Sequence, residues 1–276
     1  MLYLIGLGLS GVDDITIKSY EIIKDCDKIY MDIYTSILIG TDKKTLELYY
    51  EKPINYLNRE LLEESDDLIK EALSLKICLL IIGDPLSATT HSEIILRCID
   101  NNVKYKVLHN SSIITAVGDC GLQIYKFGEI VSIVAWDEFC KPASFYDKII
   151  ANMKRGLHTL CLLDIKIQEK SIENIIKNRP IYEPPYFLTI NKAIYQLLEI
   201  SKSKLKEDPD NALINLSTKG FGLARMGNDN QKIVSGKMEE LLNFQFGLPL
   251  HSLVIVGELH DVEQKFYEYF SMLNYI

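Results

Sequence analysis

The loop at residues 83–91, with sequence GDPLSATTH, carries the side chains best suited to ligand chemistry. It follows an unbroken apolar run at 77–82, which predicts a buried strand, and precedes apolar residues at helical spacing in 92–99. Thr90 and Glu93 have the spacing of a capping box that would open this helix. Open α/β sheets hold ligands outside the carboxyl ends of their strands, so a ligand site is one interpretation and a tight turn is the other.

Within this loop, Asp84 is the most informative residue. Its carboxylate could attract an ammonium group or accept hydrogen bonds from hydroxyl groups. The small residues Gly83, Ser87 and Ala88 would let the backbone approach a ligand closely. These properties suit small cationic ligands in general.

A second glycine-rich loop, GLGLSG at 6–11, follows the strand expected at 2–5 and matches the dinucleotide pattern G-x-G-x-x-G. Asp32, at the end of the next expected strand, lies roughly where a ribose-binding acid would be. However, Asp13 and Asp14 put negative charge where a pyrophosphate needs positive potential. A nicotinamide cofactor therefore stays an alternative, and a methyl donor such as S-adenosylmethionine fits better because it carries no phosphate.

Length and charge limit the class of protein. At 276 residues the chain is long enough for two domains, and 30 basic against 38 acidic residues give a net charge of −8. This balance argues against general affinity for nucleic acid or an anionic membrane. No apolar run approaches the roughly 20 residues that span a bilayer. Met1 leads directly into a core-like strand, so no cleavable signal is expected.

The cysteines are scattered, with no close pair typical of a zinc site or a redox couple: Cys26, Cys78, Cys98, Cys120, Cys140 and Cys161. Most lie in apolar runs, where a free cysteine behaves as a small buried hydrophobe. Reduced thiols in a chain of this length favour the cytoplasm. No metal centre is expected, because His158 and Cys161 could share a metal only with distant ligands.

Strand and helix signals alternate along the first part of the chain, which predicts a largely parallel sheet. The strands are expected at 2–5, 28–31, 77–82 and 104–108, and the helices at 19–24, 43–50, 58–73, 92–99 and 113–117. The glycine-punctuated segment 118–128 separates two expected α/β domains, 1–117 and 118–276. The second domain is expected to hold strands at 130–134, 159–163, 222–225 and 252–256, helices at 145–153, 189–200, 238–242 and 263–272, and a polar loop at 201–219.

Nine sequence blocks, in the right order, resemble the diphthine synthase family of tetrapyrrole methylases. They are MLYLIGLGL at 1–9, YTS at 34–36, GDP and ATTH within 83–91, HNSSI at 109–113, GLQIYKFG at 121–128, HTLCLLDIK at 158–166, YEPP at 182–185, GLARMG at 222–227 and GLPLHSLVIVG at 247–257. Together they span nearly the whole chain and are far more specific than one glycine pattern.

This resemblance implies the tetrapyrrole-methylase fold, with two α/β domains, a ligand cleft between them and usually a homodimer. It implies a methyltransferase that uses S-adenosylmethionine, releases S-adenosylhomocysteine and acts on a modified histidine of translation elongation factor 2. The eukaryotic type adds four methyl groups, yielding a methyl ester. A methylase of the same fold acting on tetrapyrroles or another small molecule is the alternative.

By matching motifs, the resemblance implies donor contacts at Leu9, Asp84, Ser87, Ser112, Ile113, Leu163, Met226 and His251. Simpler roles are also open, since the apolar members could be core, Ser112 a helix cap and His251 a structural histidine. The chain departs from the family at Ser87, where glycine is usual, and at Tyr186, where arginine is usual. No residue is indicated as a catalytic base, and a neutral leaving group needs no metal.

Overall fold

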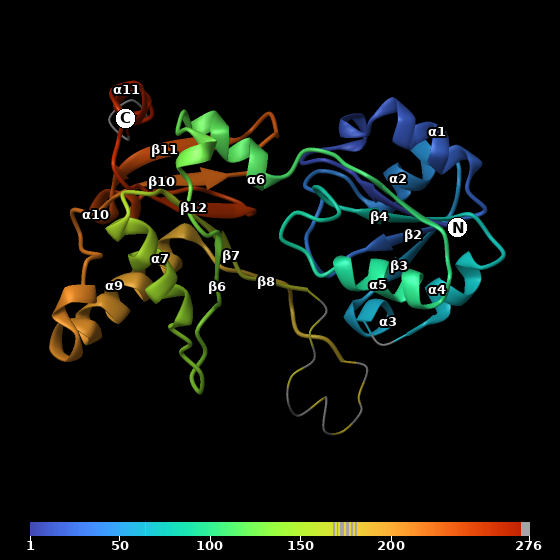
Figure 1. The fold of residues 1–276 in the computed structure, drawn as a ribbon, viewed down its shortest axis with the longest axis horizontal. Coiled ribbons are helices and arrows are strands. Elements are labelled where there is room, and N and C mark those ends of the chain that lie inside the picture. Colours follow the sequence, from blue (N-terminus) through green and yellow to red (C-terminus); the bar gives the residue numbers. More distant parts are fainter. Residues whose placement is uncertain are drawn as a thin grey trace. The chain divides into compact units, whose positions relative to one another are not determined.

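The computed structural model describes residues 1–63, 65–167, 169, 171, 174, 177, 179 and 181–271. The chain divides into two units (Figure 1). Unit 1 comprises Met1–Ile114 and Lys166–Tyr186, and unit 2 comprises Thr115–Ile165 and Phe187–Ile276. The domain boundary expected between residues 117 and 118 stays a prediction.

Unit 1 is built on a five-stranded sheet in the order β3-β2-β4-β1-β5, and all its pairings are parallel (Figure 1). The strands are β1 (Leu2–Gly6), β2 (Lys28–Asp32), β3 (Ile54–Leu57), β4 (Ile77–Ile81) and β5 (Tyr105–Leu108). The central strand β4 is buried along its whole length, as its apolar run indicates. The parallel sheet is confirmed, although β3 was not predicted.

Helices cover both faces of this sheet. They are α1 (Ile17–Asp25), α2 (Lys43–Tyr50), α3 (Arg59–Glu63), α4 (Asp67–Ala72), α5 (Ser92–Asp100) and α6 (Ile113–Ala116), with a 3-10 turn η1 (Val12–Asp14). Leu4 and Leu79 pack in one core with α3, α4 and α5. Ile5 and Leu80 pack in the other core with α1 and α2. Successive strand residues thus serve opposite faces, as strand geometry requires.

Two local predictions in unit 1 are wrong. The single helix predicted at 58–73 is instead α3 and α4, and Ser65 Oγ accepts a hydrogen bond from Asp67 N at 3.1 Å where α4 begins. Serine competes with helical backbone bonds in this way. The predicted capping box is absent, because α5 has His91 as N-cap and Glu93 N bonds the Thr90 carbonyl at 3.0 Å.

Cys26 and Cys78 form a disulfide, with their Cα atoms 6.3 Å apart. For these two residues, this overturns the expectation that the thiols are reduced. The two residues are 52 positions apart in sequence. Cys26 ends α1 and Cys78 lies within β4, so the proximity arises only when α1 packs on the sheet.

Unit 2 contains a mixed sheet in the order β11-β10-β12-β7-β6 (Figure 1). Its strands are β6 (Val131–Ile133), β7 (Thr159–Leu163), β10 (Lys219–Ala224), β11 (Lys232–Lys237) and β12 (His251–Ile255). Among the described strand pairings of this sheet, β6 and β7 pair in parallel and the other pairings are antiparallel. β11 was not predicted. A separate two-stranded sheet joins β8 (Ile165–Lys166) and β9 (Tyr186–Phe187).

The helical segments of unit 2 are α7 (Ser144–Lys154), α9 (Ile190–Glu207), α10 (Met238–Leu241) and α11 (Asp261–Tyr269), with 3-10 turns η2 (Val117–Cys120), η3 (Ile124–Lys126) and η4 (Pro209–Asn211). Thr189 caps α9, since its hydroxyl accepts a bond from Lys192 N at 3.3 Å. The loop predicted from residue 201 is partly wrong, because α9 continues to Glu207. Ser201 is buried on that helix, and Pro209 follows where the helix has ended.

Candidate functional site

Three loops meet at the carboxyl end of the sheet in unit 1, following β1, β4 and β5. Strand β1 lies between the other two in the sheet. A Cβ atom on Gly6, the last residue of β1, would lie 2.6 Å from the Gly83 carbonyl oxygen and 2.9 Å from Asn110 Cβ. Asn110 Nδ2 also donates to the Gly6 carbonyl at 3.0 Å. Glycine at position 6 thus permits the three loops to approach one another, at the edge where parallel sheets hold ligands.

The first loop is closed by a carboxylate of the protein. Asp14 Oδ2 accepts hydrogen bonds from Leu9 N at 2.9 Å and Ser10 N at 2.7 Å. Gly8 has φ of 83°, and a Cβ there would lie 2.6 Å from Asp14 Cβ. The N–H groups that would hold a pyrophosphate in a dinucleotide enzyme are therefore directed to Asp14. This arrangement argues against the nicotinamide alternative and fits a ligand without phosphate.

Asp32, the candidate ribose ligand of that alternative, is 1% exposed. Its carboxylate accepts bonds from Tyr34 N at 2.8 Å and Thr35 N at 3.3 Å, and His91 Nε2 lies 3.3 Å away. Desolvation alone would raise the pKa of Asp32. His91 nearby and the hydrogen bonds from Thr35 and Tyr34 outweigh this effect, so the pKa of Asp32 lies below its ordinary value. Asp32 is therefore buried and bonded to other residues of the protein, which argues against its role as a ribose ligand.

Asp84 receives four hydrogen bonds from the protein. Oδ1 accepts from Leu86 N at 3.0 Å and Ser87 Oγ at 3.3 Å. Oδ2 accepts from His109 Nδ1 at 2.8 Å and Asn110 N at 3.1 Å. Desolvation alone would raise its pKa, but these bonds hold the pKa of Asp84 below its ordinary value. A carboxylate has about four acceptor positions, so these bonds occupy most of the capacity of Asp84. Because its partners lie on two loops, Asp84 joins the loop after β4 to the loop after β5. Its contact with the methyl donor stays a prediction.

Ser112 and Ile113 lie at the start of α6. Ser112 Oγ accepts a bond from Ile114 N at 3.2 Å, as expected of a helix cap. A Cβ on Gly83 would lie 3.7 Å from Ser112 Cβ, which places this residue beside the loop after β4. Five of the eight predicted donor contacts thus lie on three neighbouring loops of unit 1: Leu9, Asp84, Ser87, Ser112 and Ile113.

The other three predicted contacts lie at one end of the sheet in unit 2. His251 begins β12 and pairs with Ala224, the last residue of β10. Met226 follows β10 closely, and Leu163 ends β7, the other neighbour of β12. All three predicted side chains are buried. Their roles as donor contacts stay predictions.

His251 has an unusual hydrogen-bonding state. Its Nε2 donates to the Leu248 carbonyl at 3.0 Å, so Nδ1 is the unprotonated nitrogen. Among the described residues, none bonds the buried Nδ1. Burial lowers the pKa of His251, which keeps the ring neutral. A buried acceptor without a protein donor fits the amino and hydroxyl groups of S-adenosylmethionine.

Arg225 is a structural residue of this region that the sequence did not single out. It is 5% exposed, and its guanidinium donates to the carbonyls of Phe246 and Asn230 at 3.0 Å each, and to that of Leu248. Its own φ is 52°, in the left-handed region. Arg225 therefore ties the segment holding Met226 to the segment that precedes β12. The sequence feature that could have identified Arg225 is that it is the single charged residue in the otherwise apolar block GLARMG.

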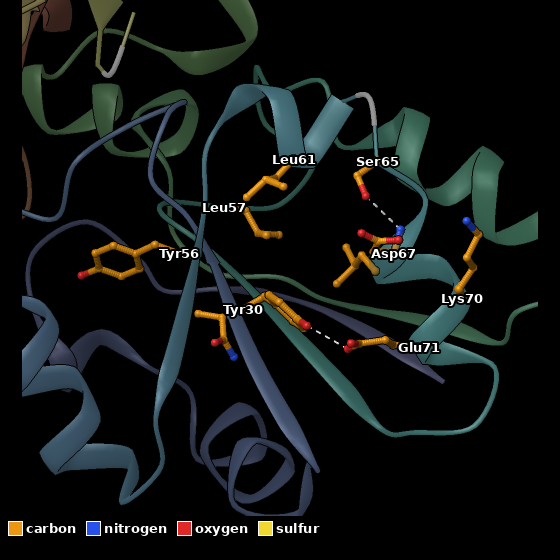
Figure 2. A pocket seen from close by; sticks show the side chains of 10 residues that line it. Tyr30, Tyr56, Leu57, Leu61, Ser65, Asp67, Lys70 and Glu71 are labelled. Carbon is orange, nitrogen blue, oxygen red and sulfur yellow. Dashed lines mark hydrogen bonds between the residues drawn. The ribbon is translucent and has the colours of Figure 1, made fainter. Parts of the chain in front are cut away.

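A separate pocket of about 380 Å³ lies in unit 1 beside β2, β3, α3 and α4 (Figure 2). Tyr30 points across it, and its hydroxyl donates to Glu71 Oε2 at 2.8 Å. Its lining comprises Tyr30, Asn55, Tyr56, Leu57, Leu61, Ser65, Asp67, Leu68, Lys70 and Glu71. The predicted donor contacts are not among these residues.

No cluster of three or more histidine, cysteine, aspartate or glutamate side chains in the described part of the chain could hold a metal ion. Within the same residues, every helix is too short or too polar to cross a membrane.

The family model of the tetrapyrrole (corrin/porphyrin) methylases matches residues 1–242. The chain belongs to this family, and it is a methyltransferase. The predicted fold class and family are confirmed.

Particular relatives narrow this class. The diphthine methyl ester synthases of Dictyostelium discoideum and Homo sapiens are each 45% identical over 274 residues, which is 99% of this chain and 98% and 95% of theirs. A solved structure of a diphthine synthase from Entamoeba histolytica is 40% identical, covers 98% of both chains and has a TM-score of 0.85. A crystal structure of diphthine synthase is 32% identical, covers 98% of this chain and 95% of its own, and has a TM-score of 0.80.

Proposed function

We propose that this methyltransferase transfers methyl groups from S-adenosylmethionine to the modified histidine precursor of translation elongation factor 2, in diphthamide biosynthesis. The product is diphthine methyl ester, which requires three methyl groups on the amine and one on the carboxylate. The observation that carries the proposal is the 45% identity to diphthine methyl ester synthases across 99% of the chain.

The proposed donor contacts are the five on unit 1 and the three on unit 2 described above. Two observations support a donor of this chemistry. The backbone N–H groups of Leu9 and Ser10 bond Asp14, which suits a ligand without phosphate. His251 Nδ1 is a buried acceptor that the described residues leave without a donor, which suits a ligand with amino and hydroxyl groups.

The donor supplies a methyl group on a sulfonium, and in-line attack by the acceptor releases a neutral thioether. The residues of this chain contribute position and desolvation. Asp84 fixes two loops of unit 1 through its four bonds, and Arg225 fixes one end of the sheet in unit 2. Rigid loops of this kind hold the reacting atoms in line at little entropic cost during the reaction.

The protein is further proposed to act as a homodimer in the cytoplasm, as the family resemblance implies. Light scattering of the purified protein tests the dimer, and a monomer mass across the working concentration range contradicts it. Fractionation of the source cells tests the location.

The experiment that tests the proposed reaction uses methyl-labelled S-adenosylmethionine with two acceptors in parallel. One is elongation factor 2 that carries the unmethylated precursor, and the other is a tetrapyrrole. Label in the elongation factor is expected. Label in the tetrapyrrole alone favours a small-molecule methylase. Calorimetry with S-adenosylhomocysteine and NAD tests the donor class, and binding of NAD alone contradicts the proposal.

A further inference from the structure

The acceptor amine must lose a proton before it can attack a methyl group, and an accessible basic side chain could receive that proton in place of water. The chain has five histidines. His91, His158 and His251 are buried, with at most 7% of each residue exposed. The two exposed histidines are His109, which follows β5, and His260, which is the N-cap of α11.

Three histidines lie within ion-pair distance of a carboxylate in the described part of the chain, and one of these pairs is open to solvent. In the pairs formed by His91 and by His158, both side chains are 0% exposed. In the third pair, the side chain of His109 is 68% exposed while that of its partner Asp84 is only 9% exposed. In an oriented general base, a mostly buried carboxylate bonds one ring nitrogen of a histidine while the rest of the ring stays accessible. The pair of His109 and Asp84 has this arrangement.

The hydrogen bond between the two residues fixes which nitrogen is basic. An ionised carboxylate only accepts, so His109 Nδ1 carries the proton in its 2.8 Å bond to Asp84 Oδ2. The lowered pKa of Asp84 keeps that carboxylate ionised. Asp84 is the one charged side chain, among the described residues, that forms an ion pair with His109. Nε2 is then the unprotonated nitrogen of an accessible ring.

The position of His109 agrees with a role in the reaction. It follows β5 at the carboxyl end of the parallel sheet, directly before the segment that holds Ser112 and Ile113. Its partner Asp84 lies on the loop that also holds Ser87, and Ser87 Oγ bonds the same carboxylate at 3.3 Å. The histidine therefore lies among the proposed donor contacts of unit 1.

We propose that His109 is the general base for methylation of the amine and that Asp84 is the positioning residue that orients it. This inference rests on the proposed function. His109 Nε2 takes one proton from the acceptor ammonium, and the freed nitrogen lone pair forms a bond to the methyl carbon. The carbon–sulfur bond breaks with its electron pair moving to sulfur, which becomes a neutral thioether. The imidazolium returns its proton to water before the next round.

This assignment separates the two kinds of methylation. Each round on the amine requires a proton to leave nitrogen. Methylation of the carboxylate requires none, because a carboxylate is already ionised near neutral pH. Loss of His109 should therefore slow the amine rounds and spare the ester round, whereas damage to the fold or to the donor site would slow both.

The test compares wild type with His109→Gln, Asp84→Asn and the control His260→Asn, which changes the other exposed histidine but keeps a capping side chain. Each protein is given two forms of elongation factor 2, one with the unmethylated amine and one with the trimethylated amine. Rates are measured from about pH 5 to pH 9, across the range in which histidines titrate. Calorimetry with S-adenosylhomocysteine measures the donor site independently of activity.

For His109→Gln, we expect amine methylation to fall by about a hundredfold or more at neutral pH, with ester formation and S-adenosylhomocysteine affinity unchanged. The wild-type amine rate should exceed the rate set by the fraction of free amine, whereas the variant rate should follow that fraction, so the two pH profiles should differ. Asp84→Asn should slow the amine rounds more than the ester round, and His260→Asn should match wild type. Equal slowing of both steps, or an unchanged pH profile, overturns the assignment. An inactive wild type would instead contradict the proposed function.

Discussion

Replacement of Glu263 by glutamine should destabilise unit 2 in a pH-dependent way. Glu263 lies on α11 and is 0% exposed. Its carboxylate accepts hydrogen bonds from Gln123 N at 2.9 Å, Lys126 Nζ at 2.9 Å, His158 Nε2 at 3.2 Å and His260 N at 2.8 Å. These bonds link α11 to the segment after α6 and to His158, which directly precedes β7, so the charge on Glu263 holds the helix in place.

The size of the effect follows from the pKa of this group. Desolvation would raise it, but the backbone bonds from His260 and Gln123, with Lys126 and His158, lower the pKa of Glu263 from 4.5 to about 2. At about 1.4 kcal/mol for each pKa unit, this shift corresponds to about 3 kcal/mol. Since the folded pKa is depressed, the contribution is full above the unfolded pKa of about 4.5 and is lost as the pH falls toward 2.

His158 acts in the same direction. Burial lowers its pKa, with the bond to Glu263 opposing that effect only in part. A neutral buried histidine gains its proton on unfolding, so its contribution is lost as the pH falls below the unfolded value of about 6.5. Acid therefore reduces the contributions of both Glu263 and His158 to the free energy of unfolding.

Urea denaturation at pH 7 and pH 3 measures the effect, with the fluorescence of Trp136, the single tryptophan, as a reporter within unit 2. Glu263→Gln should lose about 3 kcal/mol of unfolding free energy at pH 7 and clearly less at pH 3. Glu138→Gln, a change at an exposed glutamate of the same unit, is the matched control and should be neutral. An equal loss at both pH values, or no loss at pH 7, would refute this reasoning.

Three further substitutions test other parts of the structure. Ser87→Gly removes the hydroxyl that bonds Asp84 and should weaken S-adenosylhomocysteine binding by about 1 kcal/mol in calorimetry; tighter binding would show that the side chain crowds the donor. Asp84→Ala should weaken the same binding by about tenfold or more, because two bonds within the loop after β4 and two bonds to the loop after β5 are lost, and unchanged affinity would remove Asp84 from the site. Thr189→Ala removes the cap of α9 and should lower the unfolding free energy by about 1 kcal/mol, whereas equal stability would contradict the capping role.

The sequence was sufficient where local rules determine structure. The apolar runs of β1 and β4 identify buried parallel strands. Thr16 and Thr189 both cap the helices that follow them, since each hydroxyl accepts a backbone N–H. The loops at 6–11 and 83–91 were expected at the carboxyl ends of strands, where parallel sheets hold ligands, whereas Leu9 itself was implied by the family resemblance.

Features set by tertiary contact could not be predicted. β3 is a short edge strand with an exposed residue in its centre, so its pattern is weak. The disulfide of Cys26 depends on α1 packing against β4. The pairing of Asp84 with His109 depends on the strand order, which places the loops after β4 and β5 on either side of β1. None of these contacts produces a residue pattern in the sequence from which it could be predicted.

The most direct test of the central claim is mass spectrometry of the modified histidine peptide after incubation with S-adenosylmethionine. The purified chain and elongation factor 2 with the unmethylated precursor are the only proteins required. We predict that this histidine gains four methyl groups, three on the amine and one as an ester that mild base removes. An elongation factor that gains no methyl group at that histidine would contradict the account.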